Sequence, residues 1–216
     1  MCDWSQIEHV FLDMDGTLLD LHFDNYFWLE HLPQRYADIH GGDPKAVRDQ
    51  LHQRFEAIRG TLDWYCLEYW QRALEVDIVA LKREVSNRIQ LRPEASAFMD
   101  QLRQRDVQVA LVSNAHRWSI NLKIDTVLPA HYFDVIYSSH DFGFPKEEQA
   151  FWHALKGAYD FDPQHTLFID DNEQVLESAE QFGIAHLRSI RMPDSKGSPQ
   201  PPGKFPQIDR FGALFD

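Results

Sequence analysis

Two aspartates separated by one residue, Asp13 and Asp15, follow a short apolar run at residues 10–12. Such a run is typical of a buried strand, and ligands of α/β sheets bind where the strands end at their carboxyl edge. Two carboxylates at that position can converge on one site, and Gly16 directly after them allows a close backbone approach. The same residues would also suit an Asx turn without a chemical role.

Groups that can donate hydrogen bonds follow two later predicted turns. Ser113 and Asn114 follow the apolar run at residues 107–112, where a hydroxyl and an amide can bind an oxyanion, although they could instead cap a helix. Lys146 follows a turn at the predicted start of another helix. A cation is unfavourable at that end of a helix unless an anion lies near it. We therefore expect Lys146 to face an acidic group.

A second pair of acids, Asp170 and Asp171, directly follows the apolar residues 167–169. Adjacent carboxylates at the end of a buried strand repel each other unless a cation lies nearby, although two solvated acids that cap a helix would also fit. Two or three carboxylates with a backbone oxygen form a site for a hard cation, and Mg²⁺ suits it. Ser113 and Lys146 are donors suited to phosphoryl oxygens.

The elements that must position these residues alternate between strands and helices, which predicts an α/β fold with a Rossmann-like, mostly parallel sheet. Strands are expected at residues 10–12, 107–112, 135–137 and 166–169, with a weaker fifth at 184–187. Helices are expected at residues 146–159 and at 173–182, where Gly183 closes the helix, and Pro93 suits the first position of a third.

The stretch between the first two strands is far longer than the dozen or so residues that a crossover needs. We expect an inserted α-helical cap at residues 20–92 and an α/β core formed by residues 1–19 and 93–216. The cap helices are predicted at residues 24–39, 43–58, 62–74 and 76–89. The Trp and Tyr residues of this insertion are expected to form mainly a small core. Residues 192–206 are rich in Pro, Gly and Ser and predict an irregular surface segment.

Composition narrows the classes of partner and the location. The chain has 216 residues, 21 of them basic and 34 acidic, for a net charge of −13. This charge disfavours nucleic-acid polymers and membranes but allows a small phosphate monoester, because one metal ion and one lysine reverse the local field. Cys2 and Cys66 form no disulfide framework, and the N-terminal residues have no apolar stretch typical of a signal peptide. We expect a cytoplasmic protein, and the sequence leaves its oligomeric state open.

The order Asp-x-Asp, Ser, Lys, Asp-Asp resembles the motif order of the haloacid dehalogenase superfamily, and in particular its phosphatases. The resemblance covers about residues 10–187, and the helical insertion lies where that family carries its cap of the first type. A more specific likeness is to the bacterial GMP/IMP nucleotidase branch. It lies in residues 18–28, 62–70, 113–116 and 142–149, which read LLDLHFDNYFW, LDWYCLEYW, SNAH and FGFPKEEQ.

The resemblance implies roles for individual residues. Asp13 would be the nucleophile that forms an aspartyl-phosphate, and Asp15 the general acid that protonates the leaving group and then activates water. Ser113 and Lys146, with Asn114 as a weaker candidate, would bind the transferring phosphoryl group.

The metal site and the cap follow from the same resemblance. Mg²⁺ would be bound by Asp13, by the backbone carbonyl of Asp15 and by Asp171, with Asp170 outside the direct ligands. The cap would close over the site and exclude water. The implied substrate is a purine 5′-monophosphate, GMP or IMP, and Asp24, Asn25 and Tyr65 are candidates for contacts to the base.

Other activities stay open at this point. A sugar-phosphate phosphatase or a phosphomutase of the same superfamily would use the same core. A dehalogenase would not need Asp15, and a phosphonate hydrolase would need a lysine of the insertion, which has only Lys45 and Lys82. A signalling receiver domain has its acidic pair at the first strand rather than late in the chain. A catalytically inactive relative that acts as a binding or scaffold protein is the alternative of another class.

Overall fold

The computed structural model describes residues 3–215, so Cys2 lies outside the described residues. Six parallel strands form one sheet in the order β3-β2-β1-β4-β5-β6. The strands are β1 (His9–Leu12), β2 (Gln108–Ser113), β3 (Val135–Ser138), β4 (Thr166–Asp170), β5 (His186–Ile190) and β6 (Gln207–Ile208). This architecture confirms the predicted α/β fold with its mostly parallel sheet.

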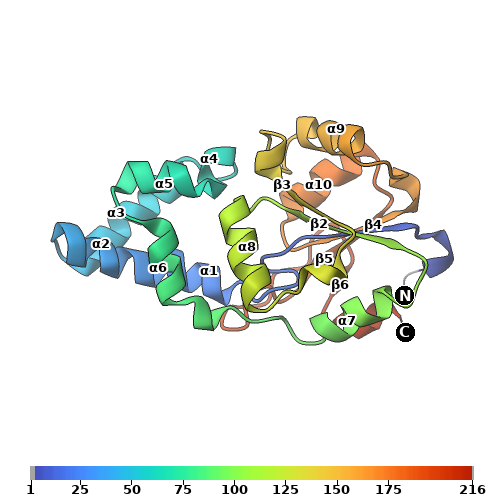
Figure 1. The fold of residues 1–216 in the computed structure, drawn as a ribbon, viewed down its shortest axis with the longest axis horizontal. Coiled ribbons are helices and arrows are strands. Elements are labelled where there is room, and N and C mark those ends of the chain that lie inside the picture. Colours follow the sequence, from blue (N-terminus) through green and yellow to red (C-terminus); the bar gives the residue numbers. More distant parts are fainter. Residues whose placement is uncertain (1–2, 216) are drawn as a thin grey trace.

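Helices cover both faces of the sheet (Figure 1), which explains why the inner positions of β1, β2 and β4 are apolar. Val10 and Leu12 of β1 belong to one cluster of buried side chains, together with residues of α7 (Ala95–Leu102) and α8 (Arg117–Thr126). Phe11 points to the opposite face and belongs to a second cluster, with residues of α9 (Gln149–Ala158) and α10 (Glu173–Phe182). The period of two along a strand produces this alternation.

The helices from α1 to α6, which lie between β1 and β2 in the chain, form a separate group at one end of the sheet (Figure 1). They are α1 (His22–Tyr26), a π-helical turn (Phe27–His31), α2 (Leu32–His40), α3 (Pro44–Ala57), α4 (Leu62–Tyr65), α5 (Leu67–Leu74) and α6 (Ile78–Glu84). We call this group the helical insertion. Its centre is aromatic as expected, with the rings of Phe55 and Trp70 4.9 Å apart and those of Trp28 and Phe55 5.5 Å apart. The division into residues 1–19, 20–92 and 93–216 stays a prediction.

Several predicted boundaries are wrong for local backbone reasons. The helix predicted at residues 62–74 is interrupted at Cys66, whose ψ of 114° is extended. Pro93 is not helical, because Glu94 before α7 has a φ of 66°. The helix expected from Lys146 begins at Gln149, so Lys146 lies in the preceding turn. The fifth strand begins two residues later than expected, at His186.

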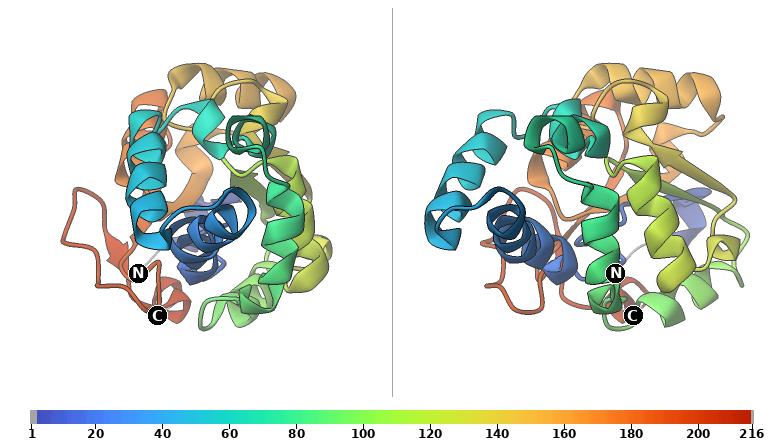
Figure 2. Two further views of the ribbon diagram at one scale, coloured as in Figure 1. Left: turned by 90° about the vertical axis from the view of Figure 1, so that its left-hand side faces the viewer. Right: turned by 60° about the vertical axis from the view of Figure 1, so that its left-hand side comes forward.

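The segment at residues 192–206 is irregular, as predicted, but it is bound to the rest of the molecule. The Leu21 N–H donates to the carbonyl of Pro193 at 2.9 Å, and Asn25 Nδ2 donates to Asp194 Oδ2 at 2.7 Å. Figure 2 shows this segment, in red, beside the first helices of the insertion. After it, Ile208 pairs with Ile190 and adds β6 to the edge of the sheet, a strand that the sequence did not predict. Within residues 3–215, no helix is both long and apolar enough to cross a bilayer.

Candidate active site

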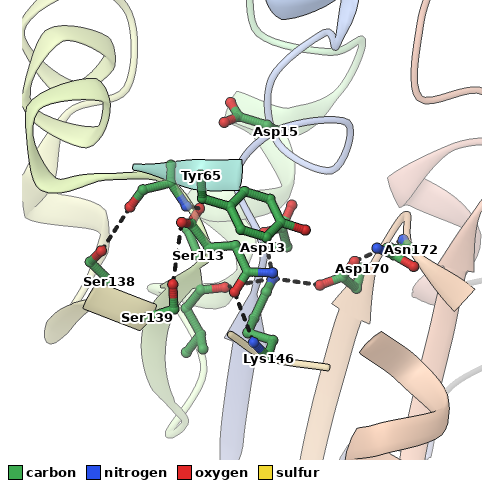
Figure 3. A network of polar contacts seen from close by, with 12 residues as sticks. Asp13, Asp15, Tyr65, Ser113, Ser138, Ser139, Lys146, Asp170 and Asn172 are labelled. Atoms are coloured by element: carbon green, nitrogen blue, oxygen red, sulfur yellow. Dashed lines mark hydrogen bonds and ion pairs between the residues drawn. The ribbon is translucent and has the colours of Figure 1, made fainter. Parts of the chain in front are cut away.

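A buried lysine joins the acids that follow β1 and β4. These strands are neighbours in the sheet with Leu12 opposite Ile169, so Asp13 and Asp170 lie side by side at the carboxyl edge. Lys146 Nζ lies 2.6 Å from Asp13 Oδ1 and 2.6 Å from Asp170 Oδ2, and its side chain is only 2% exposed (Figure 3). The expectation that Lys146 faces acids therefore agrees with the geometry.

The loops around Lys146 fix its position. Its backbone N–H donates to Asn114 Oδ1 at 2.8 Å, and its carbonyl accepts from the indole Nε1 of Trp152 on α9 at 2.9 Å. Lys146 Nζ also donates to the carbonyl of Val112 on β2 at 3.1 Å. The lysine is thus oriented by groups from β2 and α9 as well as by its two carboxylate partners.

Asp171 completes a group of three carboxylates. One oxygen each from Asp13, Asp170 and Asp171 lie within 4.8 Å of one another. Gly16 makes this approach possible, because a Cβ atom at this position would lie 2.4 Å from Asp171 Oδ2. Its φ of 85° is also one that glycine adopts without strain.

The donor set fits Mg²⁺, a hard cation that prefers carboxylate oxygens. Both oxygens of Asp170 are already engaged, one by Lys146 and the other by the Asn172 N–H at 2.8 Å. Within residues 3–215, Asp171 has no ion-pair partner. Burial raises its pKa well above the ordinary value, and the neighbouring Asp170 and Asp13 raise it further. Asp13 and Asp171 are therefore the side chains that still have oxygens available for a cation, whereas Asp170 binds Lys146.

The side chain of Asp15 lies apart from those of Asp13 and Asp170 (Figure 3). Lys123 Nζ, on α8, donates to Asp15 Oδ1 at 2.5 Å. Burial raises the pKa of Asp15 to about 6, although Lys123 opposes the shift. Burial likewise raises the pKa of Asp13 to about 6 against the effect of Lys146. The predicted metal contact from the Asp15 backbone carbonyl stays a prediction.

Ser113 and Asn114, the two predicted phosphate-binding residues at the end of β2, differ in how many of their hydrogen-bonding groups already have protein partners. Ser113 is 1% exposed, and its Oγ accepts from the Ala115 N–H at 3.1 Å, so its hydroxyl hydrogen is left to donate. Asn114 holds the loop together: its Oδ1 accepts from the Lys146 N–H, and its Nδ2 donates to Glu147 Oε2 at 2.9 Å. The Asn114 side chain also hydrogen-bonds the Tyr65 hydroxyl, so its role in binding phosphate stays a prediction.

A cavity of about 680 Å³ extends from these acids to the helical insertion. Asp13, Asp171 and Lys146 line one end, while Trp28 and Trp64 of the insertion line its walls. This volume lies in the range of small-molecule sites. The cavity therefore connects the acidic site to an aromatic surface.

The three residues predicted to contact a base line this cavity, but their polar groups have protein partners. Asp24 accepts from Lys82 at 2.8 Å and from Lys123 at 2.6 Å, one lysine on each oxygen, and its contact with a base stays a prediction. The Asn25 amide donates to Asp194, and the Tyr65 hydroxyl donates to Glu147 Oε1 at 2.8 Å.

Sequence reasoning did not predict Lys123 or Glu147, both of which contact predicted site residues. Lys123 had a detectable signal, since it follows Ser119 and Ile120 at helical spacing and so lies on the buried face of α8. Glu147 had no comparable signal, because it lies in a turn where a glutamate is ordinarily solvated.

The sequence profile of haloacid dehalogenase-like hydrolases matches residues 7–183. With this fold and this order of site residues, the chain belongs to the haloacid dehalogenase-like hydrolase family and is a hydrolase, as its motifs predict. It is 38% identical over 213 residues to the GMP/IMP nucleotidase YrfG of Escherichia coli (strain K12), which covers 98% of this chain and 96% of that protein. The GMP/IMP nucleotidase YrfG of Shigella flexneri has the same identity and coverage.

Solved structures share the fold at lower identity. A HAD phosphatase from Thermococcus onnurineus superposes with a TM-score of 0.80 at 17% identity and covers 96% of both chains. The L-2-haloacid dehalogenase from Xanthobacter autotrophicus has a TM-score of 0.53 at 17% identity, over 86% of this chain and 78% of that one. Because one fold carries a phosphatase and a dehalogenase, the reaction must be inferred from the site.

Proposed function

We propose that the protein is a Mg²⁺-dependent phosphomonoesterase that forms an aspartyl-phosphate on Asp13 and hydrolyses purine 5′-monophosphates, in particular GMP and IMP. The observation that carries this proposal is the buried Lys146, 2.6 Å from both Asp13 and Asp170, with Asp171 beside them. Burial lowers the pKa of Lys146, but Asp13 and Asp170 outweigh this effect and keep the lysine charged. A fixed cation at the nucleophile stabilises a transferring phosphoryl group.

Asp13 supplies the nucleophile and Asp15 moves the proton. A carboxylate oxygen of Asp13 attacks phosphorus, the bond from phosphorus to the ester oxygen breaks, and Asp15 protonates the leaving oxygen. Asp15 then takes a proton from the water that hydrolyses the aspartyl-phosphate. Its pKa of about 6 suits both tasks, because a group that titrates near neutral pH exchanges protons in either direction.

The remaining residues of the site bind the phosphoryl group and the metal ion, or hold the residues that do so. Lys146 and the hydroxyl of Ser113 donate to the phosphoryl oxygens, and Asp170 keeps Lys146 in place. Asp13, Asp171 and the backbone carbonyl of Asp15 would bind Mg²⁺, which when present offsets the repulsion between carboxylate and phosphate. We propose residues 20–92 as the cap that excludes water from this end of the cavity.

The nucleotide specificity is supported by the two nucleotidase relatives and by the aromatic walls of the cavity. Trp28 and Trp64 offer faces on which a purine can stack. GMP and IMP share an O6 acceptor and an N1–H donor that AMP lacks. A site that bonds this edge rejects AMP, because its own polar groups would lose their partners.

We also propose that the enzyme works in the cytoplasm on a soluble phosphate monoester. Cys66 is a free thiol, which suits a reducing compartment. The net charge of −13 disfavours a polyanion as substrate, in agreement with a small ester.

The test is phosphate release from GMP, IMP, AMP, UMP and glucose 6-phosphate, each measured with Mg²⁺ and with EDTA. We expect the highest kcat/KM for GMP and IMP, no turnover in EDTA, and a loss of ~10³-fold or more in Asp13→Asn. Asp125→Asn, at an exposed position of α8, is the matched control. Activity that survives both EDTA and Asp13→Asn would reject the mechanism, whereas preference for the sugar phosphate over every nucleotide would reject the substrate alone.

A further inference from the structure

Lys123 belongs to a buried chain of alternating charges that ends at Asp15. Its Nζ lies 2.5 Å from Asp15 Oδ1 and 2.6 Å from Asp24 Oδ2, and the other oxygen of Asp24 lies 2.8 Å from Lys82 Nζ. Lys123 is 1% exposed and Lys82 is 3% exposed. Two lysines and two aspartates thus form one continuous line with balanced charge.

This chain connects the helical insertion to the core. Lys82 belongs to α6 and Asp24 to α1, both in the insertion, whereas Lys123 belongs to α8, which packs on the sheet. The amines are also held by an aromatic ring: Phe23 lies 5.2 Å from Lys82 Nζ and 5.4 Å from Lys123 Nζ, measured to the ring centroid. The position of Lys123 is therefore defined from the insertion as well as from α8.

Stability alone does not account for this arrangement. Buried ion pairs are costly to desolvate, and replacing them with packed apolar side chains is often neutral or stabilising. Asp24 already has Lys82 as a partner, so Lys123 is not required to neutralise it. What Lys123 adds is the contact with Asp15, whose carboxyl group otherwise has no cation bound among residues 3–215.

We propose that Lys123 is a positioning residue, which holds the Asp15 carboxyl group for proton transfer. Through Asp24 and Lys82, the position of Lys123 also depends on how the helical insertion packs against the core. The inference rests on the proposed function, in which Asp15 protonates the leaving oxygen. A carboxyl group displaced by about 1 Å loses on the order of 10²-fold in rate. The insertion would thereby influence catalysis through Asp15 and not only through the closing of the cavity.

The test compares two leaving groups in Lys123→Met. The ribose 5′-oxygen of GMP is a poor leaving group and needs the proton, whereas p-nitrophenolate leaves without one. We expect kcat/KM to fall ~10²-fold with GMP and less than ~3-fold with p-nitrophenyl phosphate. Asp15→Asn provides the reference pattern, and the double variant is expected to lose no more than Asp15→Asn alone, because the two residues act through one proton transfer.

Asp24→Asn provides a second line of evidence if Lys123→Met does not fold. It keeps the shape of the side chain, removes the charge that links Lys123 to the insertion, and is expected to show the same selective loss with GMP. Equal losses with both esters, or no loss with GMP, in the folded variants would overturn the proposal. If wild type hydrolyses neither ester with Mg²⁺, the proposed function itself fails, and this outcome is separate from the other two.

Discussion

At the scale of single residues, the site consists of charges buried in opposing pairs, with one carboxylate left over. Lys146 is shared by Asp13 and Asp170, and Lys123 by Asp15 and Asp24. Among residues 3–215, Asp171 has no such cation, and burial together with the neighbouring Asp170 and Asp13 raises the cost of ionising it. A divalent cation beside Asp171 would relieve that repulsion, which is the reason for placing Mg²⁺ there in the proposed function.

Gly16→Ala tests how closely this arrangement is packed. The added Cβ would lie 2.4 Å from Asp171 Oδ2, and the φ of 85° is strained for alanine, so Asp171 must move. We expect kcat/KM to fall by ~10²-fold and more Mg²⁺ to be needed for half-maximal activity. Gly157→Ala on α9 is the matched control, because nothing lies within 4 Å of its added Cβ. Unchanged activity and metal dependence in Gly16→Ala would contradict the close contact.

At the scale of elements, the site residues lie at the ends of strands or in the turns that precede helices. β1 and β4 place Asp13 and Asp170 side by side through their register, and the turn before α9 brings Lys146 against both. In the insertion, α5 ends at a residue with an unusual backbone conformation. Glu75 after α5 has a φ of 54°, a left-handed conformation that is unfavourable for a residue with a Cβ atom.

Glu75→Gly is expected to stabilise the protein by ~0.5–1 kcal/mol, because glycine adopts this conformation without the steric cost. Chemical denaturation measures the change, and phosphatase activity is expected to stay the same. Ala80→Gly, at an exposed position inside α6, is the opposite control and is expected to destabilise by about 1 kcal/mol. A loss of stability in Glu75→Gly would show that the glutamate side chain matters more than the backbone strain.

At the scale of the whole molecule, the carboxylates of the site reduce the stability of the metal-free protein. Burial raises the pKa of Asp13 to about 6 and that of Asp171 well above its ordinary value of 3.8. The folded state therefore binds protons more tightly than the unfolded chain. Hence the contribution of these groups to the free energy of unfolding rises as the pH falls through 6. The proposed Mg²⁺ would stabilise the folded protein only while the carboxylates are ionised.

The prediction is a difference between wild type and Asp171→Asn, both measured in EDTA by thermal unfolding. As the pH falls from neutral towards the ordinary pKa of 3.8, wild type should gain stability relative to the variant, because folding raises the pKa of Asp171. Histidines with a pKa lowered by burial, such as His9 and His140, contribute the opposite slope to both proteins and cancel. Mg²⁺ should raise the Tm of wild type at neutral pH but not that of the variant. Parallel pH curves would refute the electrostatic explanation.

The sequence predicted much of the site because its residues lie beside strong local signals. Asp13, Ser113 and Asp170 follow apolar runs typical of buried strands, and the carboxyl ends of parallel strands meet at one edge of the sheet. The role of Lys123 was not predictable in the same way, because its partners are 108 and 99 residues away in the chain. The sixth strand was missed since two residues, Gln207 and Ile208, carry no pattern of their own.

By itself, the sequence determined the α/β class, because hydrophobic periodicity and strand ends are local properties of the chain. The order of its motifs indicated the family and predicted the acids and the lysine of the site. Only the tertiary structure decided which charges meet. In the folded protein, Asp170 pairs with Lys146 and Asp15 pairs with Lys123. Asp24 pairs with two lysines. These choices depend on packing between elements far apart in the sequence, where burial makes an unpaired charge costly and so selects its partner.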